Sequence, residues 1–373
     1  MIHHRQPWQR GLVALLAGLG LTVLAGCGGG QAPAQGSQRS GQDQPSAQAQ
    51  PAGPAQSPGQ GSPAGASGAA AVTPRPPDKP VEFVVTTEPG GGSDQYARFI
   101  TSVIDKYKLS PQPFLVVNKP GGAGAVGLQY LYGKKGDPNA VLITLNSVFT
   151  TPQLQKLPFK AIASDFTPVA LMALDPFVLW THVDSWKTWD DFVKAARERS
   201  VTVVGTGSKQ EDEILFNLLQ RALGGQPFKY VPEKGGGQVA AQVAGKHVEA
   251  SVNQPSEASP HYPDRMRPLV AFTEERLKFL PDVPTYKEVG LGDHSELAYY
   301  QVRGIIAAPG IPEENRAWLV DLFKRVFETK EWQDYLSQNM MVARFLGGDE
   351  FRQFLHQYDT LHAQLMRDIG WVK

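Results

Sequence analysis

The chain has 373 residues, and its 36 lysine and arginine residues balance its 36 aspartate and glutamate residues. No basic stripe interleaved with aromatic residues is present, so the composition does not favour a nucleic-acid-binding protein. Cys27 is the only cysteine, which excludes an internal disulfide.

The first 27 residues have the three parts of a secretion signal. A polar start contains Arg5 and Arg10, an apolar run extends from Gly11 to Leu24, and Leu-Ala-Gly-Cys ends at Cys27. The apolar run is too short to favour a membrane span and fits a signal peptide. The tetrapeptide resembles a bacterial lipobox, whose cysteine is lipidated and becomes the new N-terminus. We therefore expect an extracytoplasmic protein anchored to the cell membrane through Cys27, with a plain signal peptide as the alternative.

Residues 28–78 consist almost wholly of Gly, Gln, Pro, Ala and Ser, and Val72 is their only large aliphatic residue. Such a segment cannot bury enough apolar surface to fold. We expect a flexible tether with an end-to-end distance of roughly 40 Å, which holds a folded body away from a membrane. A cleavable spacer without function is the alternative.

The folded body is predicted to comprise residues 79–373, in which strands alternate with helices. Alternation of this kind favours α/β architecture with parallel sheets. The chain is predicted to end in two long helical stretches, at 313–338 and 349–369. Strands are expected at 82–86, 114–118, 141–145, 169–173, 178–182, 201–205, 228–231, 248–253, 269–273 and 301–307, and further helices at 94–107, 124–132, 189–199, 212–223 and 236–244.

Glycine-rich turns follow a strand and precede a helix in each half of the folded body. The first is Gly90-Gly91-Gly92, and the second is the segment 205–208, Gly-Thr-Gly-Ser. Glycine lets the backbone approach a ligand closely, and the first amide groups of the next helix favour an anion. Helix-start glycines are also common in ordinary α/β folds. One such turn in each half nevertheless predicts two helix N-termini that face each other across a cleft.

Other chemistry finds less support in the sequence. Residues 122–127 match the dinucleotide pattern GxGxxG, but the next strand ends without the acidic residue that would hold a ribose, so a tight turn and close helix packing explain these glycines better. The histidines are scattered, with His356 and His362 six residues apart rather than at helical metal-ligand spacing. No nucleophile elbow is present. A helix-capping role for Asp94 is favoured over a catalytic base.

Five segments in the same order resemble the solute receptors of tripartite tricarboxylate transporters, also called the Bordetella uptake gene receptors. The resemblance covers nearly all of residues 80–370. The segments are VEFVVTTEPGGGSDQYAR (81–98), VVNKPGGAGAVG (116–127), KLPFKAIASDFTPVALM (156–172), FKYVPEKGGG (228–237) and FLPDVPTYKEVGL (279–291).

The resemblance implies a two-lobed, hinged periplasmic-binding-protein fold of type II-like α/β architecture, each lobe being a sheet flanked by helices. Lobe 1 would comprise residues 79–180 and 304–373, lobe 2 would comprise 181–303, and the crossings would lie near Trp180 and Arg303. It also implies a monomeric receptor without cofactor, metal or catalytic residue. Such a receptor would capture a di- or tricarboxylate, an aromatic acid or an amino acid for the membrane subunits of a transporter. A ligand-sensing subunit for a signalling partner, or an enzyme on the same fold, is the alternative.

The family grips its carboxylate largely through backbone amide groups and water in the glycine turns. This chain departs from the family at Glu88, at the acidic run 211–213, which could simply complement the dipole of its helix, and at Glu233. Glu88 would either contact an ammonium group of the ligand or point to solvent. Carried onto this chain, the ligand-binding residues are Glu88, Gly90, Gly91, Gly92, Ser93, Asn146, Ser147, Thr206, Gly207, Ser208, Lys234, Gly235 and Asn253.

Overall fold

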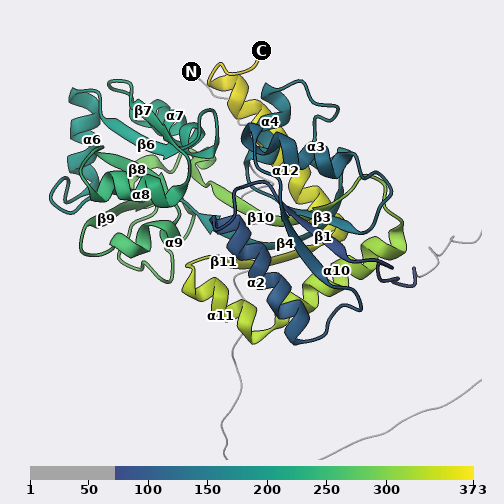
Figure 1. Cartoon of the computed structure of the whole chain (residues 1–373). Coiled ribbons are helices and arrows are strands. Elements are labelled where there is room, and N and C mark those ends of the chain that lie inside the picture. Colours follow the sequence, from purple (N-terminus) through teal and green to yellow (C-terminus); the bar gives the residue numbers. More distant parts are fainter. Residues whose placement is uncertain (1–71) are drawn as a thin grey trace, which may run out of the picture. The chain divides into compact units, whose positions relative to one another are not determined.

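Two β-sheets organise residues 72–373, the part of the chain that the computed structural model describes (Figure 1). The six-stranded sheet has the order β11-β4-β10-β3-β1-β2, and the five-stranded sheet has the order β7-β6-β8-β5-β9. We call the six-stranded sheet with its helices the first lobe, and the five-stranded sheet with its helices the second lobe. The strands are β1 (Val81–Val85), β2 (Phe114–Asn118), β3 (Ala140–Ile143), β4 (Thr167–Pro176), β5 (Val178–His182), β6 (Thr202–Thr206), β7 (Lys229–Glu233), β8 (Ala250–Asn253), β9 (Met266–Ala271), β10 (Tyr300–Ala307) and β11 (Val342–Gly347).

Both sheets are mixed, so the prediction of parallel sheets is only partly correct. In the first lobe β1 is parallel to β2 and β3, and in the second β6 is parallel to β7 and β8. β10 is antiparallel to both β3 and β4, because the chain returns from the second lobe in the opposite direction. β11 is antiparallel to β4, and β5 is antiparallel to β8 and β9. The parallel strands still end at one edge of each sheet, which is where ligands bind in open α/β sheets.

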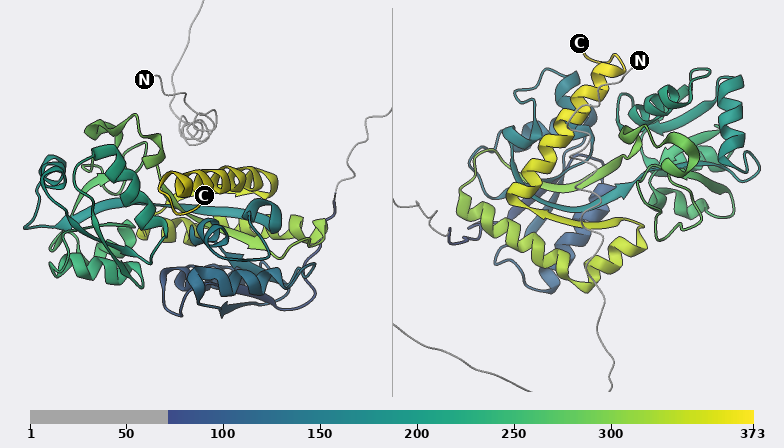
Figure 2. Two further views of the ribbon diagram at one scale, coloured as in Figure 1. Left: turned by 90° about the horizontal axis from the view of Figure 1, so that it is seen from above. Right: turned by 180° about the vertical axis from the view of Figure 1, so that it is seen from behind.

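Helices cover both faces of the first sheet. Figure 2 shows α12 on one face and α2 on the other. The predicted helix over 349–369 is confirmed, but the predicted helix over 313–338 is two helices, because Thr329 ends α10 and its hydroxyl caps α11 at the Trp332 amide. The helices are α2 (Gly92–Lys106), α3 (Ala125–Tyr132), α4 (Ser147–Leu154), α5 (Ile162–Asp165), α6 (Trp189–Glu198), α7 (Glu211–Leu223), α8 (Gly236–Ala244), α9 (Pro255–Ala258), α10 (Glu313–Glu328), α11 (Lys330–Gln338) and α12 (Gly348–Asp368).

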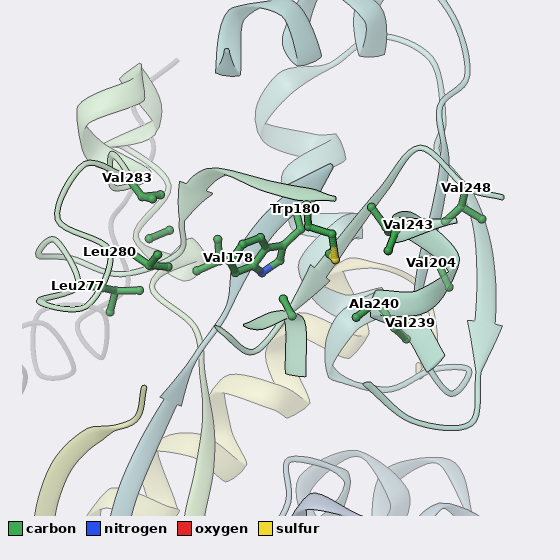
Figure 3. Close-up of a cluster of buried hydrophobic side chains, with 14 residues drawn as sticks. Val178, Trp180, Val204, Val239, Ala240, Val243, Val248, Leu277, Leu280 and Val283 are labelled. Carbon is green, nitrogen blue, oxygen red and sulfur yellow. The ribbon is translucent and has the colours of Figure 1, made fainter. Parts of the chain in front are cut away.

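The core of the second lobe is built around Trp180, which is 1% exposed and donates from its indole nitrogen to the Asn253 carbonyl at 3.2 Å. Leu280 and Val283 belong to the same buried cluster (Figure 3). They come from the segment 279–291, whose Leu-Pro-Asp-Val-Pro-Thr sequence led to the resemblance. These two residues of that motif therefore stabilise the second lobe by apolar burial.

The chain changes sheet at Phe177, between β4 and β5, and again before Tyr300, where β10 begins. The crossings expected near Trp180 and Arg303 are thus displaced slightly along the sequence, and Arg303 lies within a strand of the first lobe. This placement matters because Arg303 lies at the candidate site.

Residues 72–80 contain no helix or strand, yet they are attached to the folded body. The Arg75 amide donates to the Glu314 carbonyl at 2.9 Å, and the Asn315 side chain donates to the Arg75 carbonyl at 2.9 Å. The predicted tether therefore does not stay free up to residue 78. The predicted signal peptide, Cys27 and the tether up to residue 71 lie outside the described residues.

No helix between residues 72 and 373 combines the length and the apolar character needed to cross a bilayer.

Candidate functional site

A cavity of about 1090 Å³ is lined by residues of both lobes. It lies at the ends of strands β1, β3, β6 and β7, where the glycine turns lead into helices. A volume of this size accommodates a small organic ligand. Ten of the predicted ligand-binding residues line it, namely Glu88, Gly90, Gly91, Gly92, Ser93, Ser147, Thr206, Gly207, Lys234 and Gly235.

The turn after β1 forms one wall of the cavity. Gly90 has φ +84°, a backbone conformation that glycine adopts without strain. Its amide donates to Asp94 Oδ2 at 2.9 Å, and Asp94 also accepts from Arg98 at 2.9 Å. The hydrogen bond from Arg98 holds the pKa of Asp94 below its usual range. Asp94 therefore fixes the turn in front of α2, but it is not the helix cap that was predicted, because Gly91 is the N-cap residue and no side chain caps the helix. The first amide groups of α2 have no acceptor within the helix.

The glycines of residues 121–127 pack the next helix against this turn. A Cβ on Gly127 would lie 2.8 Å from Thr86 Cγ2 and 3.2 Å from the Lys119 carbonyl oxygen. Gly124 has φ +89° and approaches Ser147 closely. The interpretation of these glycines as a tight turn with close helix packing is therefore confirmed.

Asn146 does not line the cavity, although it was predicted to bind the ligand. It is fully buried, its amide nitrogen donates to the Tyr300 carbonyl at 2.8 Å, and its Oδ1 accepts from the Val302 amide at 3.0 Å. Asn146 thus holds the start of β10 in place. Ser147, the first residue of α4, lines the cavity.

The second lobe contributes the ends of β6 and β7. The Thr206 amide donates to Asp212 Oδ2 at 2.6 Å, and Gly207 has φ +66°. Ser208, which was predicted to bind the ligand, is exposed and does not line the cavity. The turn bends it away because Gly207 is tied to β7 through its amide, which donates to the Glu233 carbonyl at 2.8 Å.

Asn253 is also a structural residue, contrary to the prediction. It is fully buried, its side-chain amide donates to the Gly236 carbonyl at 2.9 Å, and its Oδ1 accepts from the Gln254 amide at 2.9 Å. It thereby connects the end of β8 to the start of α8. Lys234 and Gly235 remain at the cavity in front of that helix.

Buried charged residues that were not among the predicted ligand-binding residues lie in and beside the cavity. Arg303 is 5% exposed and donates to Asp175 Oδ2 from Nη2 at 2.7 Å and from Nε at 3.2 Å. Glu211 and Asp212, at the start of α7, are 6% and 2% exposed. Glu257 of α9 lies so close to the start of α8 that a Cβ on Gly236 would overlap its carboxylate. A basic residue within a predicted apolar strand, as at Arg303 in 301–307, is the signal that could have identified this pair, whereas Asp175 lies just beyond the predicted strand 169–173.

The environment of these carboxylates favours their neutral forms. Burial raises the pKa of Glu211 above its ordinary value, and the positive charge of Arg303 opposes this rise. Burial raises the pKa of Asp212 well above its ordinary value, and the negative charge of Glu211 adds to this rise. Burial, followed by the charge of Asp175, raises the pKa of Glu257 to about 7. Carboxyl groups with such perturbed pKa values inside a cleft are typical of functional sites.

No group of three or more His, Cys, Asp or Glu side chains among residues 72–373 is arranged as a metal site. The cavity therefore combines helix starts and carboxylates without a set of metal ligands in the described part of the chain.

The family model described as the tripartite tricarboxylate transporter family receptor matches residues 97–370. The chain belongs to this family. The resemblance identified from the sequence is therefore correct, and so is the prediction of a solute-binding receptor rather than an enzyme. An extracytoplasmic location accords with this membership.

Relatives extend the similarity over most of the folded body. A Cupriavidus necator protein described as a UPF0065 protein in the gbd 5' region is 24% identical over 311 residues, covering 83% of this chain and 93% of that protein. The structure of MatC from Rhodopseudomonas palustris with bound malate has a TM-score of 0.67 at 22% identity, covering 78% of this chain and 99% of that one. An R. palustris structure with adipate has a TM-score of 0.68 at 20% identity, covering 79% and 98%. These structures establish the shared two-lobed fold, which confirms the predicted fold class.

Proposed function

We propose that this receptor captures a small carboxylate in the cavity between its lobes and presents it to the membrane subunits of a tripartite tricarboxylate-type transporter. The observation that carries the proposal is the cavity, where helix starts from both lobes meet. α2 and α4 begin there in the first lobe, and α7 and α8 begin there in the second. Free amide groups at a helix start favour a negatively charged group.

The similar structures support a carboxylate as the ligand, since one has bound malate and the other is a structure with adipate. The ligand-binding residues we propose are those of the predicted set that line the cavity. Ser93 and Ser147 add hydroxyl groups beside the amide groups of α2 and α4. Binding would draw the two lobes together, as in other hinged receptors.

Calorimetry on the full chain with malate, adipate, aspartate and an aromatic acid tests the proposal. A ligand at 100 times its dissociation constant is expected to stabilise the protein by about 2.7 kcal/mol. The decisive variant is Gly92→Asp, because a Cβ at Gly92 meets nothing within 4 Å and the new carboxylate repels an anion at the start of α2. Gly92→Ala is the matched control, since it makes the same backbone change without a charge.

We expect Gly92→Asp to weaken binding at least tenfold and Gly92→Ala to change it less than threefold. A full chain that is folded and binds no carboxylate of the panel would refute the proposal.

We also propose that lipidated Cys27 anchors the receptor to the cell membrane. Detergent-phase partition of the chain expressed in a bacterial host is the measurement, with Cys27→Ala as the variant. The wild-type chain should enter the detergent phase and the variant should remain in the aqueous phase. Equal partition of the two would rule out the anchor and favour a plain signal peptide.

A further inference from the structure

The cavity is lined by more acidic than basic side chains. Five carboxylates of the described residues line it, and two basic side chains do, Lys234 and Arg303. Arg303 is already paired with Asp175, and Lys234 is exposed. A second anionic group of a ligand would therefore find little positive charge in the deeper part of the cavity. The five carboxylates are those of Glu88, Glu211, Asp212, Glu233 and Glu257.

Two of these carboxylates retain unused hydrogen-bonding capacity. Glu211 is 6% exposed, and although Gln301 supplies a hydrogen bond to its carboxylate, its buried Oε2 has no hydrogen-bond partner. Oε2 of Glu257 is likewise buried without a partner. A buried carboxylate oxygen without a donor is costly, so such groups are normally paired.

The other three lining carboxylates either accept a hydrogen bond from the protein or face solvent. Asp212 accepts from the Thr206 amide, and Glu233 accepts from the Gln242 side chain at 2.6 Å. Glu88 is exposed at the rim of the cavity. Glu211 and Glu257 are thus the two lining carboxylates that each keep one buried oxygen without a donor, and they are near enough for the charge of Glu211 to act on Glu257.

We infer that the ligand carries a protonated amine, which binds between Glu211 and Glu257, in addition to the carboxylate that the proposed function requires. An ammonium group has three donors and no acceptor, so it satisfies both free oxygens and balances their charge. The inference rests on the proposed function for the carboxylate end, which lies at the starts of α2 and α4 in the first lobe. The amine end lies at α7 and α9 in the second, so such a ligand contacts both lobes.

Matched ligands that differ only in the amine test this inference by calorimetry on the full chain at pH 8. The pairs are succinate with aspartate and glutarate with glutamate. We expect the amine-bearing member of at least one pair to bind at least tenfold more tightly. Glu211→Gln and Glu257→Gln should each reduce that preference to less than threefold. Glu213→Gln is the matched control, because Glu213 lies in the same turn of α7 but outside the cavity, and a glutamine there can still accept the Lys209 amide.

The outcomes separate the two proposals. Tighter binding of succinate and glutarate, unaffected by the glutamine variants, would overturn the amine and keep the carboxylate receptor. Binding of no ligand would overturn both. Stabilisation by calcium chloride that Glu211→Gln abolishes would assign the carboxylates to an inorganic cation and overturn the amine. Melting of the unliganded variants shows whether they fold, and both glutamine variants should melt no lower than the wild type because each removes a buried carboxylate.

Discussion

Asp175 and Arg303 form a buried ion pair, 2.7 Å from Nη2 to Oδ2, between neighbouring strands β4 and β10. Asp175 is fully buried and Arg303 is 5% exposed. Arg303 also donates to Ser93 Oγ at 3.3 Å, so the pair connects the start of α2 to the strands that lead to the second lobe. The ion pair therefore supports the geometry of the cavity as well as the sheet.

Replacement of Arg303 by methionine should destabilise the protein by about 3–5 kcal/mol, because it leaves the Asp175 carboxylate buried without its cation. Urea denaturation measures the loss. The double variant Asp175→Leu with Arg303→Met should recover most of it, since no unpaired charge remains. Lys330→Met is the control, because it breaks the exposed pair with Asp334 and should cost less than about 1 kcal/mol. If Arg303→Met and Lys330→Met lowered the free energy of unfolding equally, the assignment of a stabilising buried ion pair would be contradicted.

Gly127 and Gly133, in and just after α3, should respond differently to alanine. The Gly127→Ala Cβ would lie 2.8 Å from Thr86 Cγ2, so overpacking should cost about 1–3 kcal/mol. At Gly133 the nearest atoms lie at 3.5 Å and φ is −65°, so Gly133→Ala should be neutral or stabilise by up to about 1 kcal/mol. Thermal denaturation in parallel distinguishes them, and a stable Gly127→Ala would show that the close approach is not required.

Alanine variants of Asn146 and Ser147 should distinguish a residue that stabilises the fold from one that binds the ligand. Asn146→Ala removes the hydrogen bonds to Tyr300 and Val302 and should cost about 1–3 kcal/mol in unfolding free energy. Ser147→Ala should leave stability within about 0.5 kcal/mol and weaken carboxylate binding several-fold. Denaturation and calorimetry on both variants check this. If Asn146→Ala weakened binding and left the unfolding free energy unchanged, Asn146 would be a ligand-binding residue after all.

The contribution of Glu257 to the stability of the unliganded protein should be lost as the pH rises from about 4.5 towards 7. The pKa of Glu257 is raised to about 7 in the folded state, so the folded protein binds its proton more tightly than the unfolded chain does. That contribution is present at low pH and is lost as Glu257 ionises beside Asp175, Glu211 and Arg303. The reporter is the difference in melting temperature between wild type and Glu257→Gln, because buried His362, whose pKa is lowered to about 4, contributes with the opposite sign.

For each kcal/mol of stability that ionisation of Glu257 removes, this melting-temperature difference should change by on the order of 2–4 °C. At higher pH, Glu257→Gln should melt at the higher temperature. The affinity for an amine-bearing ligand should rise over the same range, since ionised Glu257 is the form that binds a cation. A melting difference that does not vary with pH would show that Glu257 does not titrate there.

The glycine turns were predictable because their signal is local. A strand, a glycine run and a helix start follow each other within about a dozen residues, and the carboxyl ends of parallel strands gather at one edge. The orientation of Asn146 and Asn253 was not predictable, since an asparagine after a strand can serve a ligand or a nearby backbone group equally well. Asp175 and Arg303 are 128 residues apart, and their contact depends on β10 pairing with β4. The unpartnered buried oxygens of Glu211 and Glu257 depend in the same way on the tertiary fold.

The hydrogen bonds of Arg75 have a practical consequence for handling the molecule. They attach residue 75 to the start of α10, and α12 near the other end of the chain packs on the same sheet. Within residues 72–373, the second lobe is thus an insertion between Phe177 and Tyr300, and both the first and the last described residues belong to the first lobe. A surface linkage at Arg75 or after Lys373 is therefore made to the first lobe, and if the lobes close on the ligand as proposed, a probe on the second lobe should report its displacement relative to the first.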